Sequence, residues 1–170
     1  MSNDLENEVL EIKKYPDPVL RKKSETVEVF DEELEKFVKD LFAAMHVHDG
    51  VGLAAPQVGV LKKIAVVEYE GKSYVLINPK IIEQKGTQLS EEGCLSFPGI
   101  YANVMRPEWV KIEAQNEKGE LQTLEAEGFT ARAFLHEMDH LNGKVFIDYL
   151  SNLKRNAIKK KISKNTGGHF

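Results

Sequence analysis

The chain has 170 residues, of which 42% are hydrophobic and 29% are charged, and its formal net charge is −4. These values suit a globular protein with one substantial core, so we expect residues 1–170 to form a single domain. They exclude a membrane protein, because no window approaches the roughly 18 consecutive apolar residues of a spanning helix. The acidic residues 1–10 lack the features of a secretory signal or transit peptide, and the single cysteine excludes a disulfide framework, so we expect a cytoplasmic protein.

The first long helix is predicted to follow a turn. The two prolines in Tyr15–Pro18 favour a turn, and we expect a short helix over Val19–Lys23. Asp31 is a suitable N-cap for a helix that runs to about His46 and ends at Asp49-Gly50. The apolar residues of this helix have the spacing of one helical face: Leu34, Phe37, Val38, Leu41, Phe42 and Met45.

The middle of the chain is predicted to form strands. Ile64–Glu70 and Ser73–Ile77 flank Glu70-Gly71-Lys72, which is typical of a tight hairpin. Asn78-Pro79 then predicts a break, and Ile81-Ile82 the start of another strand.

A second hairpin and two helices complete the expected fold. Trp109–Gln115 and Glu120–Ala126 are predicted strands, and Thr130 is a candidate cap for a helix through Leu141. Asn142-Gly143 suits the end of that helix, and a last helix is expected over Asn152–Ile162. Strands cluster without a βαβ alternation. This order indicates an α+β fold with mostly antiparallel sheets around a central helix, followed by a C-terminal helix.

Residues 151–170 form a basic tail on an otherwise acidic chain. The tail contains six cationic side chains and no acidic one, a formal +6, which leaves −10 for the rest of the chain. The six are Lys154, Arg155, Lys159, Lys160, Lys161 and Lys164. Such a tail suits contact with nucleic acid or a ribosome, and equally a solvated helix end.

The most informative segment is His136-Glu137-Met138-Asp139-His140. On a helix, residues at i and i+4 project from one face, so both imidazoles are placed to bind one metal ion. Glu137 lies beside them as a candidate general base. The helix is largely apolar and therefore expected to be buried, and buried histidines need partners.

Cys94 is the candidate third ligand. It lies in Glu92-Gly93-Cys94-Leu95-Ser96, a stretch whose glycine and polar residues predict a loop rather than a core element. A thiolate with two neutral imidazoles leaves a fourth position open for water, which favours a hydrolase. An inert buried thiol is the alternative interpretation.

A third cluster is Gly50-Val51-Gly52-Leu53-Ala54-Ala55-Pro56-Gln57. Its small residues permit close approach by a ligand or by the motif helix. Gln57 ends an otherwise apolar run, and its side-chain amide is able to donate to an oxyanion.

The three segments, in this order and at these separations, resemble the three signature motifs of peptide deformylase. Tyr15–Arg21 and His140-Leu141-Asn142-Gly143 are also similar to the family, and the resemblance covers roughly residues 10–155. It implies removal of the formyl group from the N-terminal formyl-methionine of new polypeptides. It also implies that Cys94, His136 and His140 bind one divalent metal, usually Fe(II), with nickel, cobalt or zinc as substitutes.

The resemblance also implies roles for the remaining site residues. Glu137 would transfer the proton, while the Gln57 amide and the Leu95 backbone N–H would stabilise the oxyanion. Val51 and Gly52 would bind an extended peptide as an added strand. We expect Val51, Leu95 and residues 129–133 to line the methionine pocket.

Other features of the resemblance concern partners. Several bacterial deformylases carry a basic C-terminal helix that docks on the ribosome, and the tail has the matching charge but ends early. We expect no sequence-specific nucleic-acid binding and no membrane contact. His46, His48 and His169 match no motif and are expected to face solvent.

Two other functions fit part of the pattern. A zinc metalloprotease of the His-Glu-x-x-His type usually takes its third ligand from a downstream His or Glu, and neither Asp148 nor His169 is well placed. A metal-stabilised binding module would need a fourth protein ligand, and the chain has no second cysteine.

Overall fold

The computed structural model describes residues 9–167, with side chains described as far as Lys164. Most of the predicted N-terminal extension 1–10 lies outside the described residues, as does the end of the tail with His169. No helix in the described part is long and apolar enough to cross a membrane.

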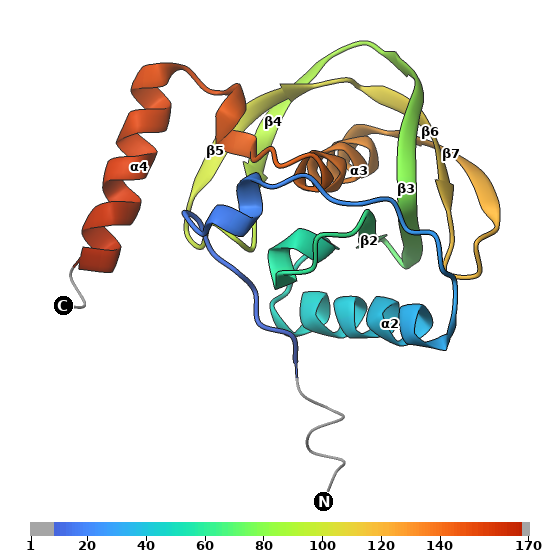
Figure 1. The fold of residues 1–170 in the computed structure, drawn as a ribbon. Coiled ribbons are helices and arrows are strands. Elements are labelled where there is room, and N and C mark those ends of the chain that lie inside the picture. Colours follow the sequence, from blue (N-terminus) through green and yellow to red (C-terminus); the bar gives the residue numbers. More distant parts are fainter. Residues whose placement is uncertain (1–8, 168–170) are drawn as a thin grey trace, which may run out of the picture.

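Two antiparallel sheets surround one helix (Figure 1). The larger sheet has the order β1-β2-β3-β6-β7, and the smaller consists of β4 and β5. The strands of the larger sheet are β1 (Gly52–Ala54), β2 (Ile64–Tyr69), β3 (Lys72–Lys85), β6 (Trp109–Gln115) and β7 (Leu121–Glu127). In the smaller sheet, β4 is Gln88–Gly93 and β5 is Tyr101–Arg106. The α+β fold expected from the sequence is confirmed.

The larger sheet packs a helix on each of its two faces. On β2, Ala65 and Val67 belong to the same core cluster as α3 (Gly128–Leu141), while Ile64 and Val66 belong to the cluster of α2 (Glu32–Val47). Because successive strand residues point to opposite faces, the continuous apolar run of β2 serves both cores. Helix α3 therefore lies at the centre of the molecule (Figure 1), and both of its histidines are buried.

The ends of α2 follow from local chemistry. The Asp31 carboxylate accepts a hydrogen bond of 3.0 Å from the Leu34 backbone N–H, which satisfies one unpaired donor of the first turn. The helix ends at Val47, and Asp49 then adopts a left-handed conformation with φ 55°. The chain leaves this turn directly toward β1.

Three predicted boundaries were wrong. Asn78-Pro79 does not end a strand, since β3 continues past it through a register shift. Asn78 has φ 51°, and its side chain forms hydrogen bonds with both the backbone N–H and the backbone carbonyl of Val27. The stretch before Cys94 is strand β4 rather than a loop, paired with β5. The motif helix begins at Gly128, two residues before Thr130.

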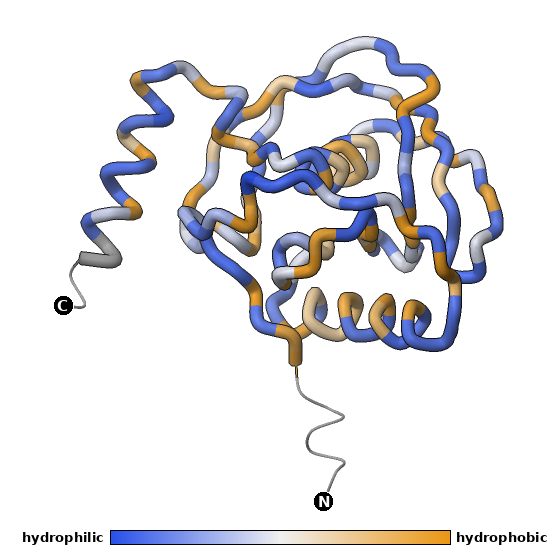
Figure 2. Tube along the Cα trace, in the orientation of Figure 1, coloured by the Kyte–Doolittle hydropathy of each residue, from blue (hydrophilic) through white to orange (hydrophobic). Residues whose placement is uncertain are grey.

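The C-terminal helix α4 (Asn152–Gly167) starts at the predicted residue and runs beyond the predicted end. It projects from the body in Figure 1, and its hydropathy colouring in Figure 2 is mostly polar. Ile158 and Ile162 are half-buried against a third core cluster that contains Leu20, Phe97 and Phe146. The 3₁₀-helices Pro18–Arg21 and Phe146–Tyr149 contribute Leu20 and Phe146 to this cluster.

Candidate active site

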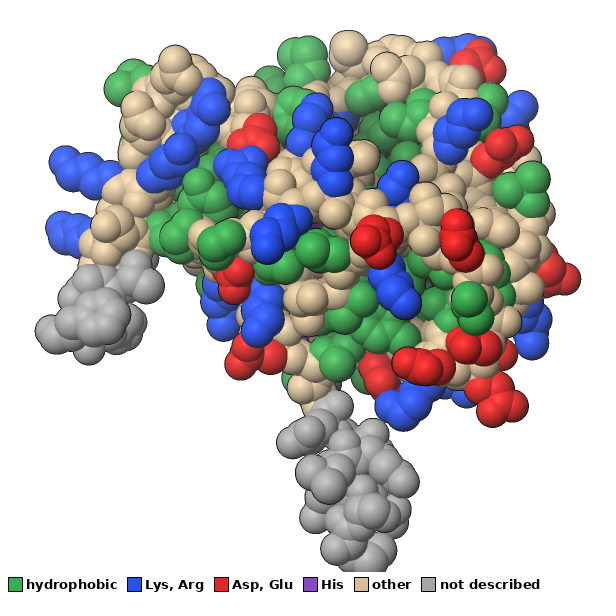
Figure 3. Space-filling view, viewed as in Figure 1, with side chains coloured by type: hydrophobic (Ala, Val, Ile, Leu, Met, Phe, Trp, Pro, Cys, Tyr) green, Lys and Arg blue, Asp and Glu red, His purple; other side chains and the backbone are tan. Residues whose placement is uncertain are grey.

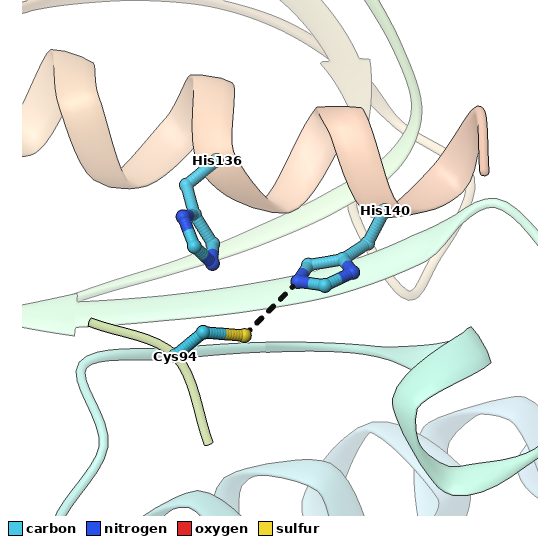
Figure 4. Close-up of side chains that lie close together, drawn as sticks. All are labelled: Cys94, His136 and His140. Carbon is cyan, nitrogen blue, oxygen red and sulfur yellow. Dashed lines mark hydrogen bonds between the residues drawn. The ribbon is translucent and has the colours of Figure 1, made fainter. Parts of the chain in front are cut away.

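Cys94, His136 and His140 converge at one point (Figure 4). Cys94 follows the last residue of β4, and the two histidines project from one face of α3, four residues apart. One donor atom from each of the three lies within 4.8 Å of the others, and the Cys94 Sγ is 3.4 Å from the His140 Nε2. Within the described residues, no fourth His, Cys, Asp or Glu joins this group.

This donor set fits a divalent transition metal. The Nδ1 of His136 lies 2.9 Å from a Glu92 carboxylate oxygen, which leaves the second ring nitrogen toward Cys94 and His140. A carboxylate that orients a ligating histidine in this way is a common feature of metal centres. A thiolate and two imidazoles suit zinc or iron, and three protein ligands leave a position for a reactant.

Glu92 is the residue that sequence reasoning missed. It is 5% exposed, and Arg106 donates two hydrogen bonds to its carboxylate, to which Arg132 also donates. Although burial opposes ionisation, the hydrogen bonds from Arg106 and His136 lower the pKa of Glu92 to about 2. The buried carboxylate is therefore ionised and fixed behind His136.

The same network reaches the surface through Asp139. Its carboxylate accepts hydrogen bonds from Arg106 at 2.9 Å and from the Tyr149 hydroxyl at 2.7 Å. Burial, together with the hydrogen bond to Asp139, raises the pKa of Tyr149 to about 12. Asp139 thus turns away from the two histidines and fixes Arg106, which in turn orients Glu92.

Glu137 lies deep in the site. It is 5% exposed, and burial raises the pKa of its carboxyl to about 7, a value suited to a group that exchanges protons near neutral pH. One of its oxygens has no hydrogen-bond partner among the described residues. A Cβ at Gly52 would lie 2.5 Å from the other oxygen, so the strand β1 approaches this carboxylate as closely as a glycine permits.

Gln57 is also buried, with 1% exposure. Its Oε1 accepts from the Ala54 backbone N–H at 2.9 Å, and its Nε2 donates to the Ser96 hydroxyl at 3.1 Å. The Nε2 also lies 3.6 Å from the Cys94 Sγ. The side-chain amide is therefore held with its NH₂ group toward the cysteine.

These groups open into one cavity of about 710 Å³. Its lining contains seven of the predicted site residues: Val51, Gly52, Gln57, Cys94, Leu95, His136 and Glu137. His140 is 1% exposed, below this lining. His48 is exposed as expected but also lines the cavity, whereas His46 lies outside it and pairs with Glu68 at 3.0 Å.

The chain is similar to known deformylases over most of its length. Residues 9–156 match the family model described as polypeptide deformylase. A peptide deformylase of Clostridium botulinum is 55% identical over 137 residues, which are 81% of this chain and 93% of that protein. The crystal structure of a Legionella pneumophila peptide deformylase superposes with a TM-score of 0.90 at 39% identity and covers 95% of this chain and 98% of that one.

Proposed function

The chain belongs to the polypeptide deformylase family, whose members remove N-terminal formyl groups from nascent polypeptides, and we propose that its reaction takes place in the cavity at Cys94, His136 and His140. The convergence of these three donors beside Glu137 carries the proposal. The products are formate and a peptide with a free amine. The protease alternative lacks a downstream ligand, since the third donor is Cys94, upstream of both histidines.

We infer that Cys94, His136 and His140 hold one divalent ion and that this ion is Fe(II). A metal bound there would polarise the formyl carbonyl and acidify water at the open position. The donor set alone suits zinc as well as iron, so the preference for iron rests on family resemblance. Glu92 keeps His136 in the orientation that binding requires, because its carboxylate occupies the other ring nitrogen.

Glu137 moves the proton. Its carboxylate is buried in the cavity wall, and an oxygen without a partner is free to accept the proton of the attacking water. The same group then returns the proton to the departing amine, so that Glu137 ends the cycle in its starting state.

Gln57 and Leu95 stabilise the oxyanion of the tetrahedral intermediate. The NH₂ group of the Gln57 amide faces the site, because the amide oxygen accepts a hydrogen bond from the Ala54 N–H. Leu95 follows Cys94 in the turn after β4, and its backbone N–H is the second donor. Donors fixed before the reaction stabilise charge without reorganising, which makes them effective in a buried site.

The peptide binds along β1. Among the described residues, this strand pairs only with β2, at the edge of the larger sheet. Its other edge is therefore available, and the segment Val51-Gly52 binds the extended peptide there as an added strand. Val51, Leu95, Phe129 and Ala133 line the same cavity, which supports a methionine pocket between β1 and α3.

We also propose that residues 1–170 form one catalytic domain that acts in the cytoplasm, with α4 as its contact to the ribosome. Lys and Arg side chains follow α4 in Figure 3, and the helix carries no acidic residue. Ribosomal RNA is a suitable partner for such a surface. Pelleting with ribosomes at increasing salt tests this contact, and binding that is absent at low salt would contradict it.

Formate release from formyl-Met-Ala-Ser tests the function. Protein purified anaerobically, with its metal content determined by mass spectrometry, should release formate rapidly. Metal-free protein reloaded with Fe(II) or zinc then identifies the active ion. Unformylated peptides serve as the comparison substrate: cleavage of these without formate release from the first would favour a protease.

A further inference from the structure

Ser96 has a buried hydroxyl that contacts the side-chain amide of Gln57. The side chain of Ser96 is completely buried, and its hydroxyl oxygen accepts the 3.1 Å hydrogen bond from the Gln57 Nε2. Its backbone carbonyl accepts a hydrogen bond of 2.9 Å from the Tyr15 N–H. The Tyr15 ring stacks on Phe97 with centroids 4.7 Å apart, so the backbone around Ser96 is held from both sides.

The Gln57 amide has three contacts of unequal strength. The Ala54 N–H is only a donor, so the atom facing it must be the amide oxygen, and a flipped amide would place two donors against each other. Of the two Nε2 hydrogens, one is directed to the Ser96 hydroxyl and the other to the Cys94 sulfur at 3.6 Å. Sulfur is a weak acceptor, so the second hydrogen is the one that a stronger acceptor would recruit.

We propose that Ser96 is a positioning residue for the reaction: by accepting one Nε2 hydrogen of Gln57, it directs the other at the developing oxyanion. The terminal torsion of a glutamine side chain has a broad energy minimum, so an anchor at the oxygen alone leaves the amide plane free to rock. The Ser96 hydroxyl supplies the second anchor. This inference rests on the proposed function, because it assigns Ser96 to the same step as Gln57.

Removing the Ser96 hydroxyl should change the orientation of the Gln57 amide rather than the shape of the cavity. In Ser96→Ala, a buried Nε2 hydrogen loses its partner and turns toward the sulfur, which draws the second hydrogen away from the oxyanion. Displacements of about 1 Å in a reacting group are enough to reduce rates by up to about 10²-fold. A hydrogen bond to the neutral formyl carbonyl is weaker than one to the oxyanion, so the loss should fall on kcat more than on KM.

A double-mutant cycle with Gln57→Leu tests the proposal. We expect Ser96→Ala to lower kcat about tenfold on formyl-Met-Ala-Ser, with KM changed less than about twofold. In the Gln57→Leu background, Ser96→Ala should lower kcat by less than about twofold. Ser24→Ala is the matched control, because Ser24 is also buried and its hydroxyl has no partner within the described chain. It should leave kcat unchanged.

The outcomes separate the two claims. Equal losses from Ser96→Ala in the wild-type and Gln57→Leu backgrounds, or an unchanged kcat in the single variant, would overturn the role of Ser96 alone. Absence of formate release from metal-loaded wild-type protein would overturn the proposed function together with this inference. Ser96→Cys, which keeps a side chain of similar shape with a poor acceptor, should repeat the kcat loss if Ser96→Ala fails to fold, as judged by circular dichroism.

Discussion

The helices α3 and α4 have similar lengths, 14 and 16 residues, but α3 is mostly buried and α4 is mostly exposed. Ten side chains of α3 are buried, including two histidines, a glutamate and an arginine. On α4, no side chain through Lys164 is fully buried. The helix is held by the half-buried Ile158 and Ile162 and by a 3.2 Å hydrogen bond from the Lys154 N–H to the Ser151 hydroxyl. The charged side chains of α3 are therefore mostly buried beside the site, whereas those of α4 mostly face solvent.

The largest expected effect lies on α3. Glu137→Ala should lower kcat by about 10⁴-fold while the protein keeps its metal, because proton transfer is lost and the ligands remain. Formate release and metal content, measured on the same sample, check this. Glu125→Ala, which removes an exposed glutamate from β7, should retain full activity. Robust turnover by the Glu137 variant would show that its carboxylate is not the proton acceptor.

Gln57→Leu should have the next largest effect. Loss of one oxyanion donor typically lowers turnover about 10²-fold or more, and the variant should keep its metal because the ligands are untouched. The ratio of kcat to metal content is the measurement. A normal ratio would remove Gln57 from the mechanism.

Glu92 connects the stability of the core to pH. Its pKa is about 2 in the folded protein, below its ordinary value of 4.5, so its contribution to stability is complete above pH 4.5 and is lost as pH falls toward 2. This shift corresponds to on the order of 3 kcal/mol. Urea unfolding of the metal-free protein at pH 5, 4 and 3 measures it. The same series on Glu92→Gln should lack this slope, and an unchanged slope would assign the acid sensitivity to another group.

The smallest effect is expected on α4. Replacing Lys159, Lys160 and Lys161 by Gln should change the free energy of unfolding by less than about 0.5 kcal/mol, because all three are exposed. Turnover of short formyl peptides should be unchanged, while pelleting with ribosomes should weaken. Three exposed lysines of the body, Lys22, Lys23 and Lys39, provide the control. Equal loss of pelleting in both variants would indicate nonspecific charge attraction.

Sequence patterns predicted the elements in which local chemistry and burial agree. The cap Asp31 and the apolar stripe after it located α2, and Asn142-Gly143 located the end of α3, where Gly143 has φ 74°. The metal-binding motif could be found because its spacing is a local property of one helix.

The errors arose where distant residues decide the outcome. The predicted strand ended at Asn78 because this residue type favours turns. In the structure, the Asn78 side chain forms hydrogen bonds with the Val27 N–H and carbonyl, and β3 continues. The β4 strand looked like a loop because Glu92, its one buried side chain, is charged. Its pairing with Arg106, Arg132 and His136, which are distant in the sequence, makes that carboxylate a core residue. A glutamate two residues before the predicted ligand was the available signal.

Because Gly52 has no side chain, the backbone of β1 lies close to the Glu137 carboxylate. A methyl group at Gly52 would lie 2.5 Å from a carboxylate oxygen of Glu137, so there is no room for a side chain between β1 and this carboxylate. A peptide bound one residue out of register along β1 would be displaced by about 3.3 Å, which exceeds the tolerance of a hydrogen bond. In the proposed binding mode, selectivity for the first residue of a chain is therefore set by distance along this strand.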